Sequence, residues 1–253
     1  LFFTTTAKAQ KEAETFNVDS TLYEYYQRCQ EYLLEPVVLN MSDTLFRMAG
    51  ERQDERMQAV AIATQLDYYY FQGTNEDSVI HYTNKVKEFA KATHQPKYYY
   101  FAWANRLITY YLKTSRTNIA LYEVQNMLKE AQEEDDKTGL SRCYNIMSQI
   151  YTIKRFDSMA FEWRLKEIEL TEKYKIENYN ISQTYAQIAN YYINQKKQKE
   201  ALAAVEKAIA TANSSTQQIS AKLEFVNYYS KFGDFQAAEK LLKECQAAFE
   251  QDK

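Results

Sequence analysis

A regularly spaced line of polar side chains is the most chemically informative feature of this sequence. Its members stand two or six residues before a series of recurring tyrosines: Asn105, Thr109, Asn145, Gln149, Asn190 and Asn227. Residues four apart share one face of a helix, and an amide can donate to and accept from a peptide backbone at once. Arg106 and Arg142 lie beside the line and could bind a carboxylate. The pattern predicts a surface that binds a partner's extended backbone, with an ordinary solvated face as the alternative.

Catalysis and metal binding are not expected from the other residue types. His81 and His94 are the only histidines, and neither belongs to a cluster of the three or four convergent ligands that zinc requires. The four glycines are isolated, so the sequence has no glycine-rich phosphate loop. Three widely separated cysteines favour buried thiols over a disulfide framework or a metal site. We expect no enzyme, no catalytic or metal-binding residue and no cofactor.

The charge pattern limits the classes of partner. The net charge of -3 arises from mixed signs, and no basic patch is interleaved with aromatic residues. Nucleic acid is therefore not expected as a partner of this region. No apolar run approaches the roughly 18 to 20 residues of a membrane span. We expect a protein or an extended peptide as the partner, membrane attachment only through segments outside this chain, and homodimerisation as an open alternative.

The line of amides must be positioned by a repeated helical unit. Tyr70, Tyr111, Tyr151, Tyr192 and Tyr229 recur at separations of 41, 40, 41 and 37 residues. Nine residues after each tyrosine stands a small side chain: Val79, Ala120, Ala160, Ala201 and Ala238. Between the tyrosine and the small residue lies a short polar turn. This constant offset predicts helix pairs, with the last four tyrosines buried between the helices of their own pairs.

At these positions the chain resembles the tetratricopeptide repeat (TPR) family. The matching packing residues of two repeats are Tyr185, Ile188, Ala189, Tyr192, Ala201, Val205 and Ala208, then Phe225, Tyr229, Gly233, Ala238 and Leu242. The resemblance covers roughly residues 54 to 250, although the units exceed the family period of about 34 residues. Asp67, Arg164 and Glu167 stand where the family has small or apolar residues. The resemblance implies that the amide-bearing face lines a concave groove for extended peptides.

The expected fold is all-α, a right-handed superhelical solenoid of about six TPR-like antiparallel helix pairs. Residues 10–53 are expected to form an atypical N-terminal capping pair, whose second helix begins near Asn40. Residues 54–253 are expected to form the repeat array as one continuous domain. Repeat arrays commonly have atypical terminal units. The very low glycine and proline content, four and two residues, agrees with long helices.

The first residues suggest export from the cytoplasm. Residues 1–9 combine an apolar fragment with Ala7-Lys8-Ala9, the small-residue pattern of a secretory cleavage site. We interpret them as a signal-peptide remnant and expect a periplasmic or otherwise extracytoplasmic location. The chain then resembles the sensor region of TPR-linked membrane regulators such as histidine kinases. The alternatives are a cytoplasmic TPR peptide receptor, similar to regulators of peptide quorum sensing, and a plain assembly scaffold.

Overall fold

The structure, a computed structural model of the chain, describes residues 17–176, 178 and 180–251. The predicted signal-peptide remnant, residues 1–9, lies outside the described residues. The helices are α2 (Ser20–Glu31), α3 (Val37–Glu51), α4 (Glu55–Gln72), α5 (Glu76–Ala92), α6 (Pro96–Ala102), the π-helix η1 (Trp103–Ile108), α7 (Thr109–Lys113), α8 (Thr117–Glu133), α9 (Lys137–Ile153), α10 (Asp157–Tyr174), α11 (Ile181–Asn194), α12 (Gln198–Ala210), α13 (Ser215–Phe232) and α14 (Phe235–Gln251). Because α6, η1 and α7 follow one another without a break, the described chain forms 12 helical rods in six pairs.

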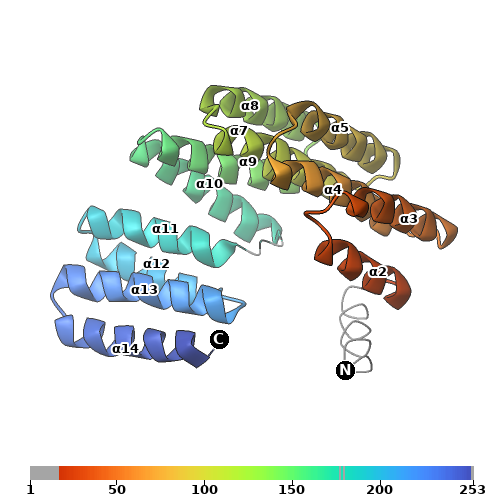
Figure 1. Cartoon of the computed structure of the whole chain (residues 1–253). Coiled ribbons are helices and arrows are strands. Elements are labelled where there is room, and N and C mark those ends of the chain that lie inside the picture. Colours follow the sequence, from red (N-terminus) through yellow and green to blue (C-terminus); the bar gives the residue numbers. More distant parts are fainter. Residues whose placement is uncertain (1–16, 177, 179, 252–253) are drawn as a thin grey trace. The chain divides into compact units, whose positions relative to one another are not determined.

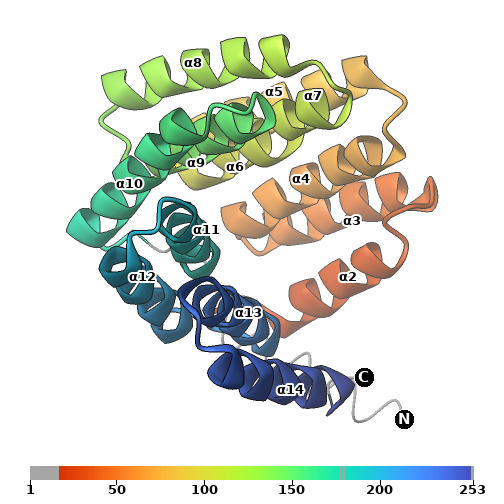
Figure 2. The same cartoon turned by 90° about the vertical axis from the view of Figure 1, so that its left-hand side faces the viewer.

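The chain divides into two compact units at the junction of Cys143 and Tyr144, within α9. In the first unit, α4 packs against α3 and α5, and α5 packs against α6. In the second unit, α11 packs against α12, both contact α13, and α13 pairs with α14. Consecutive helices of each unit run antiparallel to one another (Figure 1; Figure 2). The predicted all-α, TPR-like solenoid of helix pairs is confirmed, whereas the predicted division at residues 53 and 54 stays a prediction.

The small residues at the constant offset are buried, as predicted. Val79, Ala120, Ala160 and Ala201 are fully buried and Ala238 is 6% exposed, so the helices of each pair approach closely at these points. The recurring tyrosines differ in how deeply they are buried. Tyr111 is buried, but the other three of the last four are half-buried: Tyr151, Tyr192 and Tyr229. Each of these three rings packs on one side against another aromatic ring. The predicted burial is therefore confirmed for Tyr111 and is partial for the other three.

The turns inside the last four pairs share one backbone motif. Four residues after each tyrosine stands a residue in the left-handed conformation: Ser115, Arg155, Lys196 and Gly233. The next N–H donates to the tyrosine carbonyl, as from Arg116 to Tyr111 at 2.8 Å and from Asp234 to Tyr229 at 2.9 Å. This is the six-to-one hydrogen bond that ends many helices. Only one of the four left-handed positions is a glycine, although glycine adopts this conformation most readily.

Proline sets the start of α3. The helix begins at Val37, directly after Pro36, and so three residues before the position expected from the sequence. The fixed φ of proline suits the first turn of a helix, where no intrahelical partner is needed for its missing N–H. The helices α2 and α3 share one core with the start of α4, in which Leu22, Cys29, Val38 and Leu45 are fully buried.

All three cysteines are free and buried, as the sequence indicated, and burial raises the pKa of Cys29 to about 11. Such thiols are inert at neutral pH. Across the residues described above, no set of three or more His, Cys, Asp or Glu side chains is placed to hold a metal ion. None of the described helices combines the length and apolar character that crossing a membrane requires.

Candidate partner-binding site

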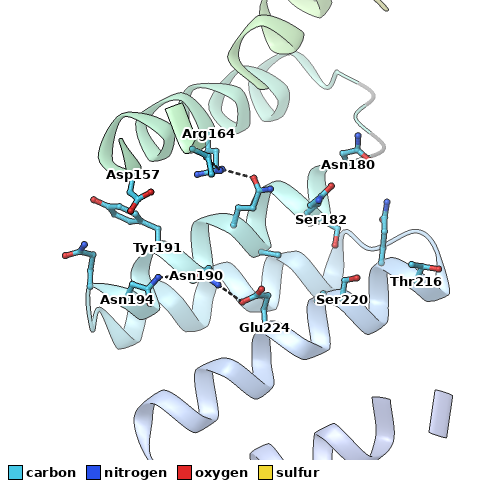
Figure 3. Close-up of a pocket in the computed structure, with 17 residues that line it drawn as sticks. Asp157, Arg164, Asn180, Ser182, Asn190, Tyr191, Asn194, Thr216, Ser220 and Glu224 are labelled. Atoms are coloured by element: carbon cyan, nitrogen blue, oxygen red, sulfur yellow. Dashed lines mark hydrogen bonds between the residues drawn. The ribbon is translucent and has the colours of Figure 1, made fainter. Parts of the chain in front are cut away.

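A polar pocket of about 640 Å³ opens in the second unit between the end of α9 and helices α10, α11 and α13 (Figure 3). Its wall consists mainly of amide, hydroxyl and charged side chains. The members that matter for binding are Thr152, Asp157, Arg164, Gln187, Asn190, Ser220 and Glu224. Asn190 is the one residue among those predicted from the sequence that lines this pocket. The pocket can therefore present both donors and acceptors to a bound chain.

A buried guanidinium forms one wall of the pocket. Arg164 on α10 is only 8% exposed. Its Nε donates to Oε1 of Gln187 at 2.7 Å, and its Nη2 donates to Oγ1 of Thr152 at 2.8 Å. Burial lowers the pKa of Arg164, and the charges of Glu167 and Asp157 partly oppose that shift. The two hydrogen-bond acceptors of the Arg164 guanidinium are neutral side chains.

Amides and a carboxylate form the facing wall. Asn190 on α11 donates through Nδ2 to Oε2 of Glu224 on α13 at 3.4 Å, and its Oδ1 accepts from Asn194 at 2.9 Å. Asn227, also on α13, donates to the same oxygen of Glu224 at 3.4 Å and is exposed. These two 3.4 Å contacts are long for hydrogen bonds. A ligand's own N–H groups could therefore replace them at small cost.

Asn145 lies on α9 and donates hydrogen bonds to a buried carboxylate. Its Nδ2 is 3.2 Å from both carboxylate oxygens of Glu167, which is 2% exposed on α10. Asn178 donates to the same group at 3.0 Å. Burial raises the pKa of Glu167, although the hydrogen bonds from Asn145 and Asn178 oppose the shift. Gln149 is exposed and donates to Oδ1 of Asn145 at 2.7 Å. The donor of Asn145 is thus engaged inside the protein.

The remaining predicted residues belong to the first unit, where two of them lie in the π-helix η1. Asn105 and Arg106 are both half-buried. In this wide turn the hydroxyl of Thr109 donates a hydrogen bond to the carbonyl oxygen of Ala104 at 2.9 Å. Arg106 pairs with the carboxylate of Asp67 on α4 through Nε and through Nη2, the latter at 3.1 Å. Short π-helical turns of this kind occur frequently at functional sites.

The third residue of this group is Arg142 on α9. Its Nη1 donates to Oδ1 of Asn105 at 3.1 Å, so the side-chain carbonyl of Asn105 orients the guanidinium of Arg142. Sequence periodicity could not reveal this arrangement, because the π-helix breaks the four-residue spacing on which the line of amides was based. The prediction that five amides face one channel, with Arg106 and Arg142 nearby, concerns both units together and stays a prediction; the five are Asn105, Asn145, Gln149, Asn190 and Asn227.

Comparison with known proteins shows what kind of fold carries these residues. No protein-family model matches the sequence, and no curated protein sequence matches it. The structure is similar to BtubC (BKLC) from P. vanneervenii, with 13% identity over 92% of each chain and a TM-score of 0.65. It is similar to a putative kinesin light chain of Podosopora anserina with nearly identical TPR-like repeats, at 14% identity over 79% of this chain and 97% of that one, with a TM-score of 0.55.

A third solved structure is the apo form of RapI, at 12% identity, covering 97% of this chain and 68% of that one, with a TM-score of 0.62. The fold is TPR-like. At these identities the similarity concerns the fold alone. In this TPR-like arrangement α9, α11 and α13 are the first helices of their pairs, and all three contribute to the polar pocket or end at it.

Proposed function

We propose that this TPR-like chain is a non-enzymatic module that binds an extended segment of a protein or peptide in the polar pocket of the second unit. The observation that carries the proposal is the composition of the pocket wall. Amides and hydroxyls from α11 and α13 face a volume of about 640 Å³, with the buried Arg164 on one side and Glu224 on the other. Volumes of this size are typical of ligand-binding sites.

The chemistry of the wall suits a peptide backbone better than an apolar ligand. An extended chain carries one donor and one acceptor for nearly every residue. Asn190 and Gln187 can offer both kinds of group, whereas Ser220 can donate or accept with a freely rotating hydroxyl. Arg164 favours a carbonyl oxygen or an acidic group at its end of the pocket, and Glu224 favours an N–H or a cation at the other. This polarity suggests that the segment binds in one preferred direction.

We further propose that the module belongs to a larger regulator of signal transduction, as its extracytoplasmic sensor or interaction region. This setting depends on residues 1–9, which are not among the described residues. The alternatives are a cytoplasmic peptide receptor and an assembly scaffold. Mass spectrometry of the native N-terminus and fractionation of the source cell distinguish them, because an uncleaved N-terminus in the cytosol contradicts the extracytoplasmic setting.

A peptide selection tests the binding proposal. Random twelve-residue peptides displayed on phage would be selected against the immobilised chain, and the affinities of selected clones measured as synthetic peptides with blocked ends. Replacing Asn190 and Ser220 by alanine together should weaken binding roughly tenfold, because each lost hydrogen bond contributes about 0.5–1.5 kcal/mol.

The matched control is Gln246→Ala, which removes an exposed amide from α14, outside the pocket. This variant should bind the selected peptides with the affinity of the unmodified chain. If peptides bind the pocket variant and the control equally well, the partner lies elsewhere on the surface and the pocket assignment is wrong. If selection yields no binding peptides at all, the peptide-binding function itself is contradicted.

A further inference from the structure

The turns inside the three helix pairs of the second unit bring basic side chains to one edge of that unit. These turns join α9 to α10, α11 to α12 and α13 to α14, and all three lie on the left side of the second unit in Figure 1. They carry six cations: Lys154, Arg155, Lys196, Lys197, Lys199 and Lys231. The connection at residues 211–214, which lies at the other edge, carries no charged side chain. We call the edge with the six cations the basic edge.

The charges of the basic edge are not neutralised by ion pairs. Five of the cations are exposed, and none of the five forms a side-chain hydrogen bond or an ion pair with another residue in the described part of the chain: Arg155, Lys196, Lys197, Lys199 and Lys231. Asp157 and Glu200 also lie at this edge, in the first turns of α10 and α12. Asp234 accepts a hydrogen bond from the N–H of Ala237 at 3.0 Å. Because the three carboxylates stand at helix starts, they offset the partial positive charge there, and the six cations outnumber them.

Exposed apolar side chains project from the same edge. Phe156 directly precedes α10 and is 53% exposed, and Phe235 begins α14 and is 70% exposed. Ile153, at the end of α9, is 52% exposed. None of the three lines the polar pocket of this unit. Apolar side chains on protruding turns, beside cations that lack counter-charges, are typical of a surface that binds an anionic membrane.

We propose that the basic edge of the second unit docks on an anionic lipid bilayer. Phe156 and Phe235 enter the boundary between headgroups and acyl chains, and the lysines of the α11–α12 turn contact lipid phosphates. That turn lies between the other two, because α11 packs against both α10 and α13. A lipid surface can therefore meet all three turns at once.

This surface was not apparent in the sequence, because its residues come from three separate turns. Membrane attachment was accordingly expected only through segments outside this chain. The basic edge does not depend on the polar pocket binding a peptide, and its test requires no peptide.

Co-sedimentation of the whole chain with lipid vesicles tests the proposal. Vesicles of phosphatidylcholine alone are compared with vesicles of equal parts phosphatidylcholine and phosphatidylglycerol. We expect the chain to bind only the anionic vesicles, and to bind them more weakly as salt screens the charges. If the chain binds neither kind of vesicle, or binds both equally, the proposal is overturned. Binding to a single-stranded oligonucleotide but not to anionic vesicles would assign the edge to nucleic acid and overturn it as well.

A charge-matched pair of variants identifies the edge that binds. Lys196→Gln with Lys197→Gln removes two cations from the basic edge. Each cation near an anionic membrane strengthens binding about fivefold, so this variant should bind at least about tenfold more weakly. Lys173→Gln with Lys175→Gln removes the same charge at the opposite end of α10, where both side chains are exposed. It should change binding by less than about twofold, because charges beyond a Debye length of the membrane are screened. Equal weakening in the two variants would contradict docking through the basic edge.

A second matched pair tests the aromatic rings. Phe156→Ser with Phe235→Ser should weaken binding to anionic vesicles roughly tenfold or more, because both rings lose their burial in the bilayer. Tyr174→Ser with Phe249→Ser removes two exposed rings near the opposite ends of the same helices and should leave binding unchanged. Circular dichroism reports whether each variant is folded. Equal binding by the two variants would refute insertion of the phenylalanines, and the lysine variants remain decisive if a serine variant fails to fold.

Discussion

Replacing Asn145 by alanine separates a structural role from a binding role at a residue that the sequence assigned to a partner. The substitution removes the amide that lies 3.2 Å from both oxygens of Glu167, a side chain only 2% exposed. A hydrogen bond to a charged group contributes about 1.5–3 kcal/mol. Asn178 still donates to the carboxylate at 3.0 Å, so Glu167 is not left without a hydrogen-bond donor. We expect the free energy of unfolding to fall by about 1.5–3 kcal/mol, which corresponds to a melting temperature roughly 3–12 °C lower.

Asn190→Ala is the matched control for this measurement. Asn190 also donates to a carboxylate on a neighbouring helix, but its distance to Glu224 is 3.4 Å and Glu224 is half-buried. Water can replace the lost donor there, so the cost should stay below about 0.5 kcal/mol. Urea unfolding followed by circular dichroism gives the free energies of unfolding, and ¹³C NMR of the Glu167 carboxyl gives its pKa.

The pKa of Glu167 provides a second, independent measurement of the role of Asn145. The hydrogen bond from Asn145 lowers the pKa of Glu167 against the larger effect of burial. Asn145→Ala should therefore raise the pKa of Glu167 further above its ordinary range, whereas Asn190→Ala should not affect it. Equal unfolding midpoints for the two variants, together with an unchanged Glu167 pKa, would refute the assignment of Asn145 to the interior.

Three further predictions follow from the structure. Because burial raises the pKa of Glu167 in the folded chain, the stability linked to its protonation is full below the ordinary glutamate pKa and is lost as the pH rises through the raised value; Glu167→Gln should flatten this dependence in urea unfolding between about pH 4 and pH 8. Lys196→Gly should raise the free energy of unfolding by about 0.5–1 kcal/mol, because Lys196 has a φ of 57° that glycine adopts without strain; a lower urea midpoint would contradict this. Gly139→Ala should cost about 1–3 kcal/mol, since an added Cβ would lie 2.8 Å from the Tyr100 ring. Gly50→Ala is its control, because the Cβ would meet only the end of a flexible side chain; equal melting temperatures for the two alanine variants would argue against the close approach at Tyr100.

The sequence was sufficient for the features that depend on local periodicity. The helix pairs and the buried small residues, such as Ala160 and Ala201, follow from an offset repeated along the chain. The turn inside each pair follows from the same register, because it lies between a tyrosine and the small residue nine positions later. Half-burial of Tyr192 was not predictable in this way, since the exposure of a ring depends on which neighbours cover its outer edge.

The candidate site was less predictable, because its decisive contacts join distant parts of the sequence. Arg106 pairs with Asp67, which is 39 residues away, and Arg164 bonds to Gln187, which is 23 residues away. A helical pattern indicates which face of a helix a side chain occupies, but it does not identify the group on the next helix. The unusual charges at Asp67 and Arg164 were nevertheless visible as departures from the TPR pattern, and both proved to be members of polar networks.

The π-helix η1 has a consequence for the register of the whole rod from residue 96 to residue 113. A regular α-helix turns by about 100° for each residue, so one residue more or fewer rotates everything beyond it by more than a quarter of a circle. The wider turn at Trp103–Ile108 absorbs this rotation within a single segment. Tyr100, before the segment, and Tyr111, after it, are both buried. Deleting Ala104 should therefore convert the segment to an ordinary helix and leave both rings buried, because the π-helix accommodates one residue more than an ordinary helix without changing the register of the packing surfaces on its two sides.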